Sequence, residues 1–175
     1  MGCTILRVGR LMPVVCWLWA ASVGAREAIT AINPSQLPVL SPQKVALGRQ
    51  LFEEPALAAG GVFSCASCHQ LDKATADGRD FSLGRDDKPL GYNTPGVTYA
   101  TLNHYFTWTG RFATLSDHLR GLIENPRILN TSWPEVIGRL KQLKDYPARF
   151  REAGYPALDA DSVADALITF EQSLV

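Results

Sequence analysis

The segment that decides the fold is residues 60–69, which read Gly-Gly-Val-Phe-Ser-Cys-Ala-Ser-Cys-His and end in Cys65, Cys68 and His69. Cys-x-x-Cys-His is the attachment site of a c-type haem. Two thiols three positions apart lie on one face of a helical turn, where they can form thioethers to the two vinyl groups of one porphyrin. The adjacent histidine then binds the iron as its proximal ligand. We therefore predict one covalently bound haem c, attached through Cys65 and Cys68, with His69 on the iron.

Two other uses of this pattern fit less well. A structural zinc site needs four ligands at workable spacing, but outside the N-terminal segment the remaining candidates are His104 and His118, which do not give a zinc-finger spacing. A thioredoxin-like dithiol needs a βαβ context, which the pattern of apolar residues does not indicate. A plain dithiol or disulfide stays open as the alternative to haem.

The first 25 residues have the composition of a secretory signal. Arg7 and Arg10 precede a short apolar stretch, and Val23-Gly24-Ala25 has the small residues of a cleavage site. We predict a signal peptide over residues 1–25, a single domain over residues 26–175, and a periplasmic location. An uncleaved anchor is the alternative, although an apolar stretch of about 12 residues is short for a bilayer.

The composition of residues 26–175 excludes some partners and one type of iron ligation. Removal of residues 1–25 takes away two arginines and no acidic residue, which leaves 15 basic and 17 acidic residues without a basic block. We therefore expect no nucleic-acid partner. The only methionines are Met1 and Met12, so residues 26–175 cannot supply the His/Met ligation of an ordinary electron-carrier cytochrome c. The sixth iron position must take another donor or water, or stay open.

The pattern of apolar and helix-capping residues predicts an all-α fold. Ser41-Pro42 begins a helix that Pro55 ends. Residues 72–113 carry most of the turn signals, and we expect a long loop there that wraps the haem. The other predicted helices cover residues 65–71, residues 115–124 with Thr114 or Ser116 as cap, a segment from Ser132 to Leu143, residues 146–153, and a last helix capped by Asp159 or Asp161.

An ordered set of short motifs resembles the N-terminal haem domain of the bacterial di-haem cytochrome c peroxidases, a group that includes the enzyme that matures tryptophan tryptophylquinone. The resemblance covers about residues 40–175. It rests on Leu47-Gly48-Arg49-Gln50-Leu51-Phe52, the haem motif, Asp77-Gly78-Arg79, Asn93-Thr94-Pro95, Trp108-Thr109-Gly110-Arg111, Thr114-Leu115 and the tail at residues 166–171. This resemblance implies a cytochrome c-like haem domain that reduces hydrogen peroxide with electrons from a small donor protein, a cytochrome c or a cupredoxin.

The resemblance also implies roles for particular residues. Trp108 matches a tryptophan on the electron path between two haem domains, with a packed core aromatic as the alternative. Asn93 falls at one contributor to a calcium site between the domains, with a turn residue as the alternative. His118, where relatives have a distal glutamine, is the candidate catalytic base, and Arg85 is a candidate for stabilising negative charge. The alternatives for these two are a polar surface position and a solvated loop charge, and for His104 we favour a structural or surface role.

The sequence also departs from the family pattern. The distal histidine of many members falls at Arg85, the distal glutamate falls at Ile128, and the 175 residues contain one Cys-x-x-Cys-His motif. We therefore expect either a peroxidase domain that works with a second haem domain or as a homodimer, or a single-haem electron carrier or haem sensor without peroxidase activity. A haem domain that has lost its function is a third interpretation.

Overall fold

The computed structural model describes residues 31–175, and these residues form helices and loops without a strand. The helices are α1 (Pro42–Glu53), α2 (Cys65–Cys68), α3 (Leu115–Glu124), α4 (Trp133–Gln142), α5 (Tyr146–Glu152) and α6 (Ala160–Gln172). Short 3-10 turns lie at Pro34–Gln36, Pro55–Leu57, Ala59–Gly61 and Ala100–Leu102. The predicted all-α class is confirmed. The predicted signal peptide lies outside the described residues.

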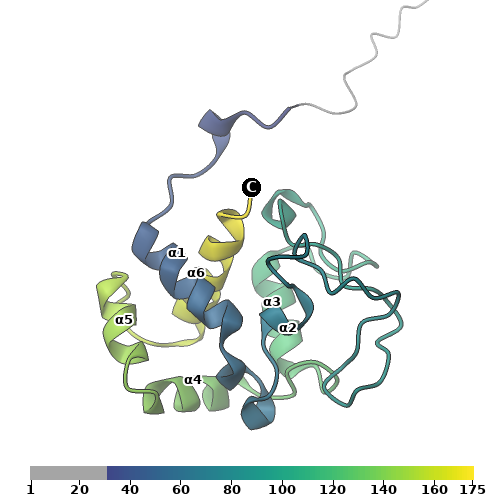
Figure 1. Cartoon of the computed structure of the whole chain (residues 1–175). Coiled ribbons are helices and arrows are strands. Elements are labelled where there is room, and N and C mark those ends of the chain that lie inside the picture. The colour runs from purple at the N-terminus through teal and green to yellow at the C-terminus, as the bar shows by residue number, and fades with distance from the viewer. Residues whose placement is uncertain (1–30) are drawn as a thin grey trace, which may run out of the picture. The chain divides into compact units, whose positions relative to one another are not determined.

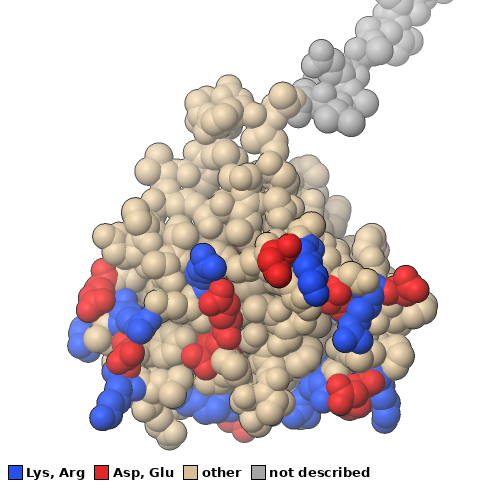
Figure 2. All heavy atoms as spheres, viewed as in Figure 1, with Lys and Arg blue, Asp and Glu red and all other residues tan. Residues whose placement is uncertain are grey.

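Residues 37–175 form one compact unit, and the 3-10 turn Pro34–Gln36 belongs to a separate one. Within residues 31–175 no helix is long and apolar enough to cross a membrane. Figure 2 shows basic and acidic side chains interspersed on the visible face, without a large area of one sign.

The helices begin where side chains satisfy their first backbone N–H groups. Ser41 Oγ accepts from the Lys44 N–H of α1, Thr114 caps α3, and Asp159 caps α6. Thr114 and Asp159 are therefore the caps, rather than the alternatives Ser116 and Asp161.

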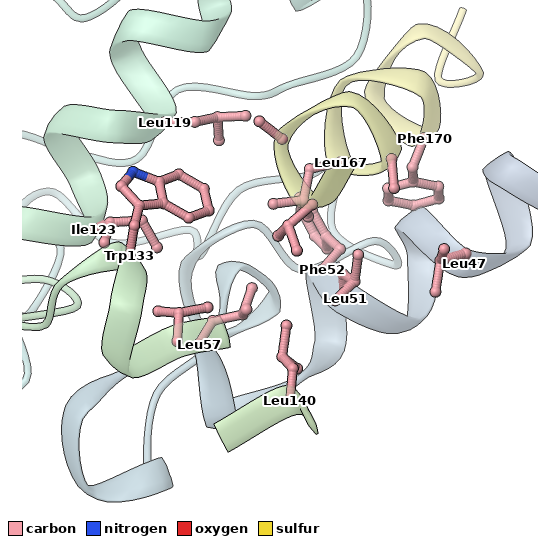
Figure 3. Close-up of a cluster of buried hydrophobic side chains, with 14 of the residues drawn as sticks. Leu47, Leu51, Phe52, Leu57, Leu119, Ile123, Trp133, Leu140, Leu167 and Phe170 are labelled. Carbon is pink, nitrogen blue, oxygen red and sulfur yellow. The ribbon is translucent and has the colours of Figure 1, made fainter. Parts of the chain in front are cut away.

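The centre of the unit is the packing of α1 against α6 (Figure 1). Phe52 of α1 and Phe170 of α6 meet edge to face, with ring centroids 5.2 Å apart. Gly48 lets the two helices approach, because a Cβ atom at that position would run into the Ala166 carbonyl oxygen and lie 2.7 Å from Phe170 Cβ. Figure 3 shows this core continuing through Leu119 and Ile123 of α3 and Trp133 and Leu140 of α4.

This pair of helices also positions the segments that carry the predicted site residues. Helix α2 packs against α1, and α3 packs against α6. The predicted haem-attachment helix is shorter than expected, since it ends at Cys68 rather than at Leu71. The chain between α2 and α3 contains one 3-10 turn and two isolated bridges, as the prediction of a long loop required. Figure 1 shows it as teal loops on the side of α2 and α3 away from α5.

Candidate haem site

The two cysteines of the motif lie at the ends of the single turn of α2. Ser64 and Ser67 form a capping box that fixes the start of this turn. The thiols are not joined in a disulfide. Burial, with the negative charge of Glu171 second, raises the pKa of Cys65 to about 12, and burial also raises the pKa of Cys68. A redox-active dithiol needs a lowered thiol pKa, so the surroundings of these cysteines argue against that alternative.

His69 has the tautomer that a metal ligand needs. Its Nδ1 lies 3.2 Å from the Thr75 carbonyl oxygen. A carbonyl can only accept a hydrogen bond, so Nδ1 carries the proton and Nε2 keeps a free lone pair. Burial lowers the pKa of His69, which keeps the ring neutral. Metal-binding histidines usually donate their second ring N–H in this way, so the donor set of Cys65, Cys68 and His69 fits a c-type haem.

His118 lies half-buried on α3 between two phenylalanine rings. Its ring stacks on Phe106 with centroids 6.1 Å apart and an interplanar angle of 14°, and Phe112 lies 5.5 Å away on a tilted plane. Gly121, one turn along α3, makes room for Phe112, because a Cβ atom there would lie 2.6 Å from Phe112 Cζ. The structure therefore does not place His118 as a freely solvated surface side chain.

Burial keeps the imidazole of His118 neutral. Burial, and secondly the charge of His69, lowers the pKa of His118 to about 4, so the imidazole is neutral at pH 7. His118 Nδ1 is buried and has no hydrogen-bond partner among the described residues. A neutral imidazole held by aromatic rings can accept a proton from a bound molecule.

Arg85 makes its recorded contacts away from the two histidines. One guanidinium nitrogen donates to the Ala59 carbonyl at 3.2 Å, and its backbone N–H bonds the Arg127 carbonyl at 3.0 Å. Among residues 31–175, no hydrogen bond joins Arg85 to His69 or His118. The side chain is half-buried and Nε has no partner in the described part of the chain, so it is not a plain solvated charge either.

Trp108 lies at the surface rather than in the core. It is 57% exposed, and its Nε1 donates to the Asn93 carbonyl at 2.9 Å. The interpretation of Trp108 as a packed core aromatic is therefore wrong.

The described residues contain no cluster of three or more His, Cys, Asp or Glu that could hold a metal ion, and calcium binding at Asn93 stays a prediction. His104 is exposed, and Ile128 packs partly against the core.

One surface hollow of the described residues is not part of this site. It lies beside α1 and α5, has a volume of about 590 Å³, and is lined by Gln50, Glu54, Tyr146 and Arg149 among others. None of the predicted site residues lines it, so it does not compete with the histidine pair as the candidate site.

Two residues at the site were not singled out from the sequence. Thr75 lies in a loop without a recognisable pattern, and its carbonyl faces His69. Glu171, in the tail motif, is buried near enough to Cys65 for its charge to raise the pKa of the thiol. The position of Glu171 at i+4 from Leu167 could have indicated a buried face, whereas no sequence signal marks Thr75.

Comparison with known sequences assigns the family. The sequence profile described as "Di-haem cytochrome c peroxidase" matches residues 42–175. The chain belongs to the di-haem cytochrome c peroxidase family. This membership confirms the resemblance and the cytochrome c-like fold, and it supports c-type haem as the cofactor and peroxidase chemistry for the family as a whole.

Individual relatives agree with this assignment. The chain is 35% identical over 143 residues to the cytochrome c peroxidase Ccp of Escherichia coli K12, covering 81% of this chain and 30% of that protein. It is 37% identical over 138 residues to the methylamine utilization protein MauG of Methylorubrum extorquens, covering 78% of this chain and 39% of that protein. The chain therefore spans well under half the length of these relatives.

The fold of this chain is also similar to those of solved structures. A solved structure of a MauG-like protein associated with microbial copper homeostasis superposes with a TM-score of 0.71 at 25% identity, covering 91% of this chain and 47% of that one. The diheme peroxidase BthA of Burkholderia thailandensis shows the same fold, with a TM-score of 0.59 at 21% identity over 82% of this chain and 41% of that one.

Proposed function

We propose that this chain is a periplasmic N-terminal haem domain that reduces hydrogen peroxide as part of a two-haem unit, with electrons from a small donor protein such as a cytochrome c or a cupredoxin. The observations that carry the proposal are the hydrogen bond that joins His69 Nδ1 to the Thr75 carbonyl and the half-buried imidazole of His118 between two phenylalanine rings. Family membership supports the reaction type, and the signal-like composition of residues 1–25 supports the location.

The haem would supply the redox chemistry, since its iron can take electrons singly and react with peroxide. The residues of the chain would hold and orient it. Cys65 and Cys68 would form the two thioether bonds, and His69 Nε2 would bind the iron, with the Nδ1–H group held by the Thr75 carbonyl.

His118 would move the protons. Because its pKa lies at about 4, its neutral ring can accept the first proton of hydrogen peroxide and return it to the departing oxygen, which leaves as water. The complete reaction consumes two electrons and two protons for each peroxide and yields two waters. Loss of one positioned acid–base group costs typically 10²–10⁴-fold, and Ile128, at the position of the family's distal glutamate, has no atom that can accept a proton.

A second redox centre would supply the second electron. The loop between α2 and α3 exposes five large aromatic side chains, which are Phe81, Tyr92, Tyr99, Tyr105 and Trp108. Exposed aromatic side chains are enriched where proteins meet. We propose that a second haem domain or a second copy of this chain docks against this loop, that Trp108 lies on the electron path, and that calcium binds near Asn93.

The second candidate function is a single-haem electron carrier or haem sensor. Ile128 favours this second function, because its side chain cannot accept a proton. Arg85 favours it as well, because its guanidinium contacts Ala59 rather than the histidines. Under that function His118 would keep the iron site closed or bind a sensed ligand, and peroxide would turn over slowly or not at all.

Steady-state peroxide reduction by the haem-loaded protein, with a chemical reductant in place of the second redox centre, separates the two functions. We expect His118→Ala to lower the rate by about 10²-fold or more, while His104→Ala, the same change at an exposed histidine, keeps the wild-type rate. Equal rates for all three proteins would show that His118 is not the base. A wild-type rate at the level of the free-haem background would favour the carrier or sensor.

A further inference from the structure

The hydroxyl group of Thr75 joins two segments of the long loop. Thr75 is buried, and its Oγ1 donates to the Ala74 carbonyl at 2.7 Å. The same oxygen accepts from the backbone N–H groups of Val97 at 2.7 Å and Thr98 at 3.2 Å. Thr98 Oγ1 lies 3.2 Å away as a further partner. A hydroxyl has one proton and two lone pairs, so these contacts use its full capacity.

The first of the two joined segments carries the carbonyl group that faces His69. The Thr75 carbonyl oxygen lies 3.2 Å from His69 Nδ1. Gly96 permits the close approach of the segments, because a Cβ atom there would lie 3.0 Å from the Ala74 oxygen and 3.2 Å from Thr75 Oγ1.

The backbone at Thr75 adopts a conformation that it would not adopt unaided. Its φ is +58°, and that of Ala74 is +52°. Positive φ is rare for a β-branched residue and strains its backbone. The hydrogen bonds of the side chain offset this cost, so the direction of the Thr75 carbonyl depends on the Thr75 hydroxyl.

We propose that Thr75 is a positioning residue for the proximal ligand: its hydroxyl aims the Thr75 carbonyl at His69 Nδ1–H and thereby sets how strongly His69 donates to the haem iron. A well-directed hydrogen bond from Nδ1–H makes the imidazole a stronger donor. A stronger donor stabilises ferric over ferrous iron, so the hydrogen bonds of the Thr75 hydroxyl lower the reduction potential of the haem. The inference rests on the haem that His69 holds in the proposed function, but not on peroxide turnover.

A redox titration of the haem-loaded protein tests this role. Thr75→Val keeps the shape of the side chain and removes the hydroxyl. We expect it to raise the ferrous-to-ferric ratio at a fixed potential about tenfold, which is 59 mV for a one-electron couple. The iron–histidine stretching band in the resonance Raman spectrum of the ferrous protein should shift to lower frequency. Thr75→Ser, which keeps the hydroxyl, should restore both readouts to near the wild-type values.

Two further variants separate this role from a general loss of stability. Thr169→Val removes a buried hydroxyl that bonds the Asp165 carbonyl within α6, and it should leave both readouts unchanged. Gly96→Ala should force the two segments apart and shift the potential in the same direction as Thr75→Val, and it serves as the test if Thr75→Val does not load haem. A wild-type potential in Thr75→Val, or in Gly96→Ala where Thr75→Val does not load haem, would overturn the proposal. Equal shifts in Thr75→Val and Thr75→Ser would do the same.

Discussion

Glu171 should make the stability of this protein depend on pH in a defined direction. It lies on α6, its side chain is only 5% exposed, and no hydrogen bond to its carboxyl group is recorded within residues 31–175. Burial raises its pKa from 4.5 to about 7. The unfolded chain exposes this carboxyl to water, so its pKa returns to the ordinary value there.

This difference in pKa between the two states makes the folded protein less stable as the pH rises. Below pH 4.5 the carboxyl is protonated in both states. As the pH rises towards 7, the unfolded chain ionises and the folded protein does not, so the free energy of unfolding falls. One pKa unit is worth about 1.4 kcal/mol, so the total loss is about 3 kcal/mol and is complete slightly above pH 7.

Glu171→Gln removes the ionisable group and keeps the size of the side chain. Urea denaturation of the haem-loaded protein at several pH values between 4.5 and 8 should show the variant gaining about 3 kcal/mol relative to wild type across this range. Glu124→Gln, the same change at an exposed position of α3, should show no such gain. A difference between Glu171→Gln and wild type that is constant with pH would refute the raised pKa.

Other predictions concern the core and the distal histidine. Gly48→Ala should destabilise the protein by about 1–3 kcal/mol, because the added Cβ would collide with α6. Gly138→Ala in α4, where a Cβ would have no neighbour within 4 Å, should stabilise the protein by about 0.5–1 kcal/mol. Thermal unfolding measures both changes, and equal effects would contradict the packing of α1 on α6. Peroxide reduction by the wild-type protein should fall as the pH drops through about 4, because His118 then becomes protonated and cannot accept a proton. Activity that increases through this range would exclude His118 as the base.

The sequence predicted the helices well because their signals are local. Ser41-Pro42, Thr114 and Asp159 mark helix starts through hydrogen bonds that form within three residues. The attachment motif is equally local, since its spacing alone places two thiols and a histidine around one turn.

The remaining features depend on contacts between distant segments. Thr75 meets Val97 and Thr98 across more than 20 residues, and no propensity indicates such a contact. His118 is sheltered by Phe106 and Phe112 from the preceding loop. Trp108 lies exposed with its indole N–H on the Asn93 carbonyl, a contact across 15 residues that no local pattern indicates.

The most direct test of the haem assignment is the covalent haem content of the protein, purified from a host that matures c-type cytochromes. Intact mass and the reduced pyridine spectrum of the denatured protein should show one haem per chain, held by two thioether bonds. Cys65→Ala and Cys68→Ala should each retain a haem held by one such bond, and exposed Tyr105→Ala should behave as wild type. A wild-type protein that releases its haem on denaturation, or carries none, would contradict the assignment of Cys65, Cys68 and His69.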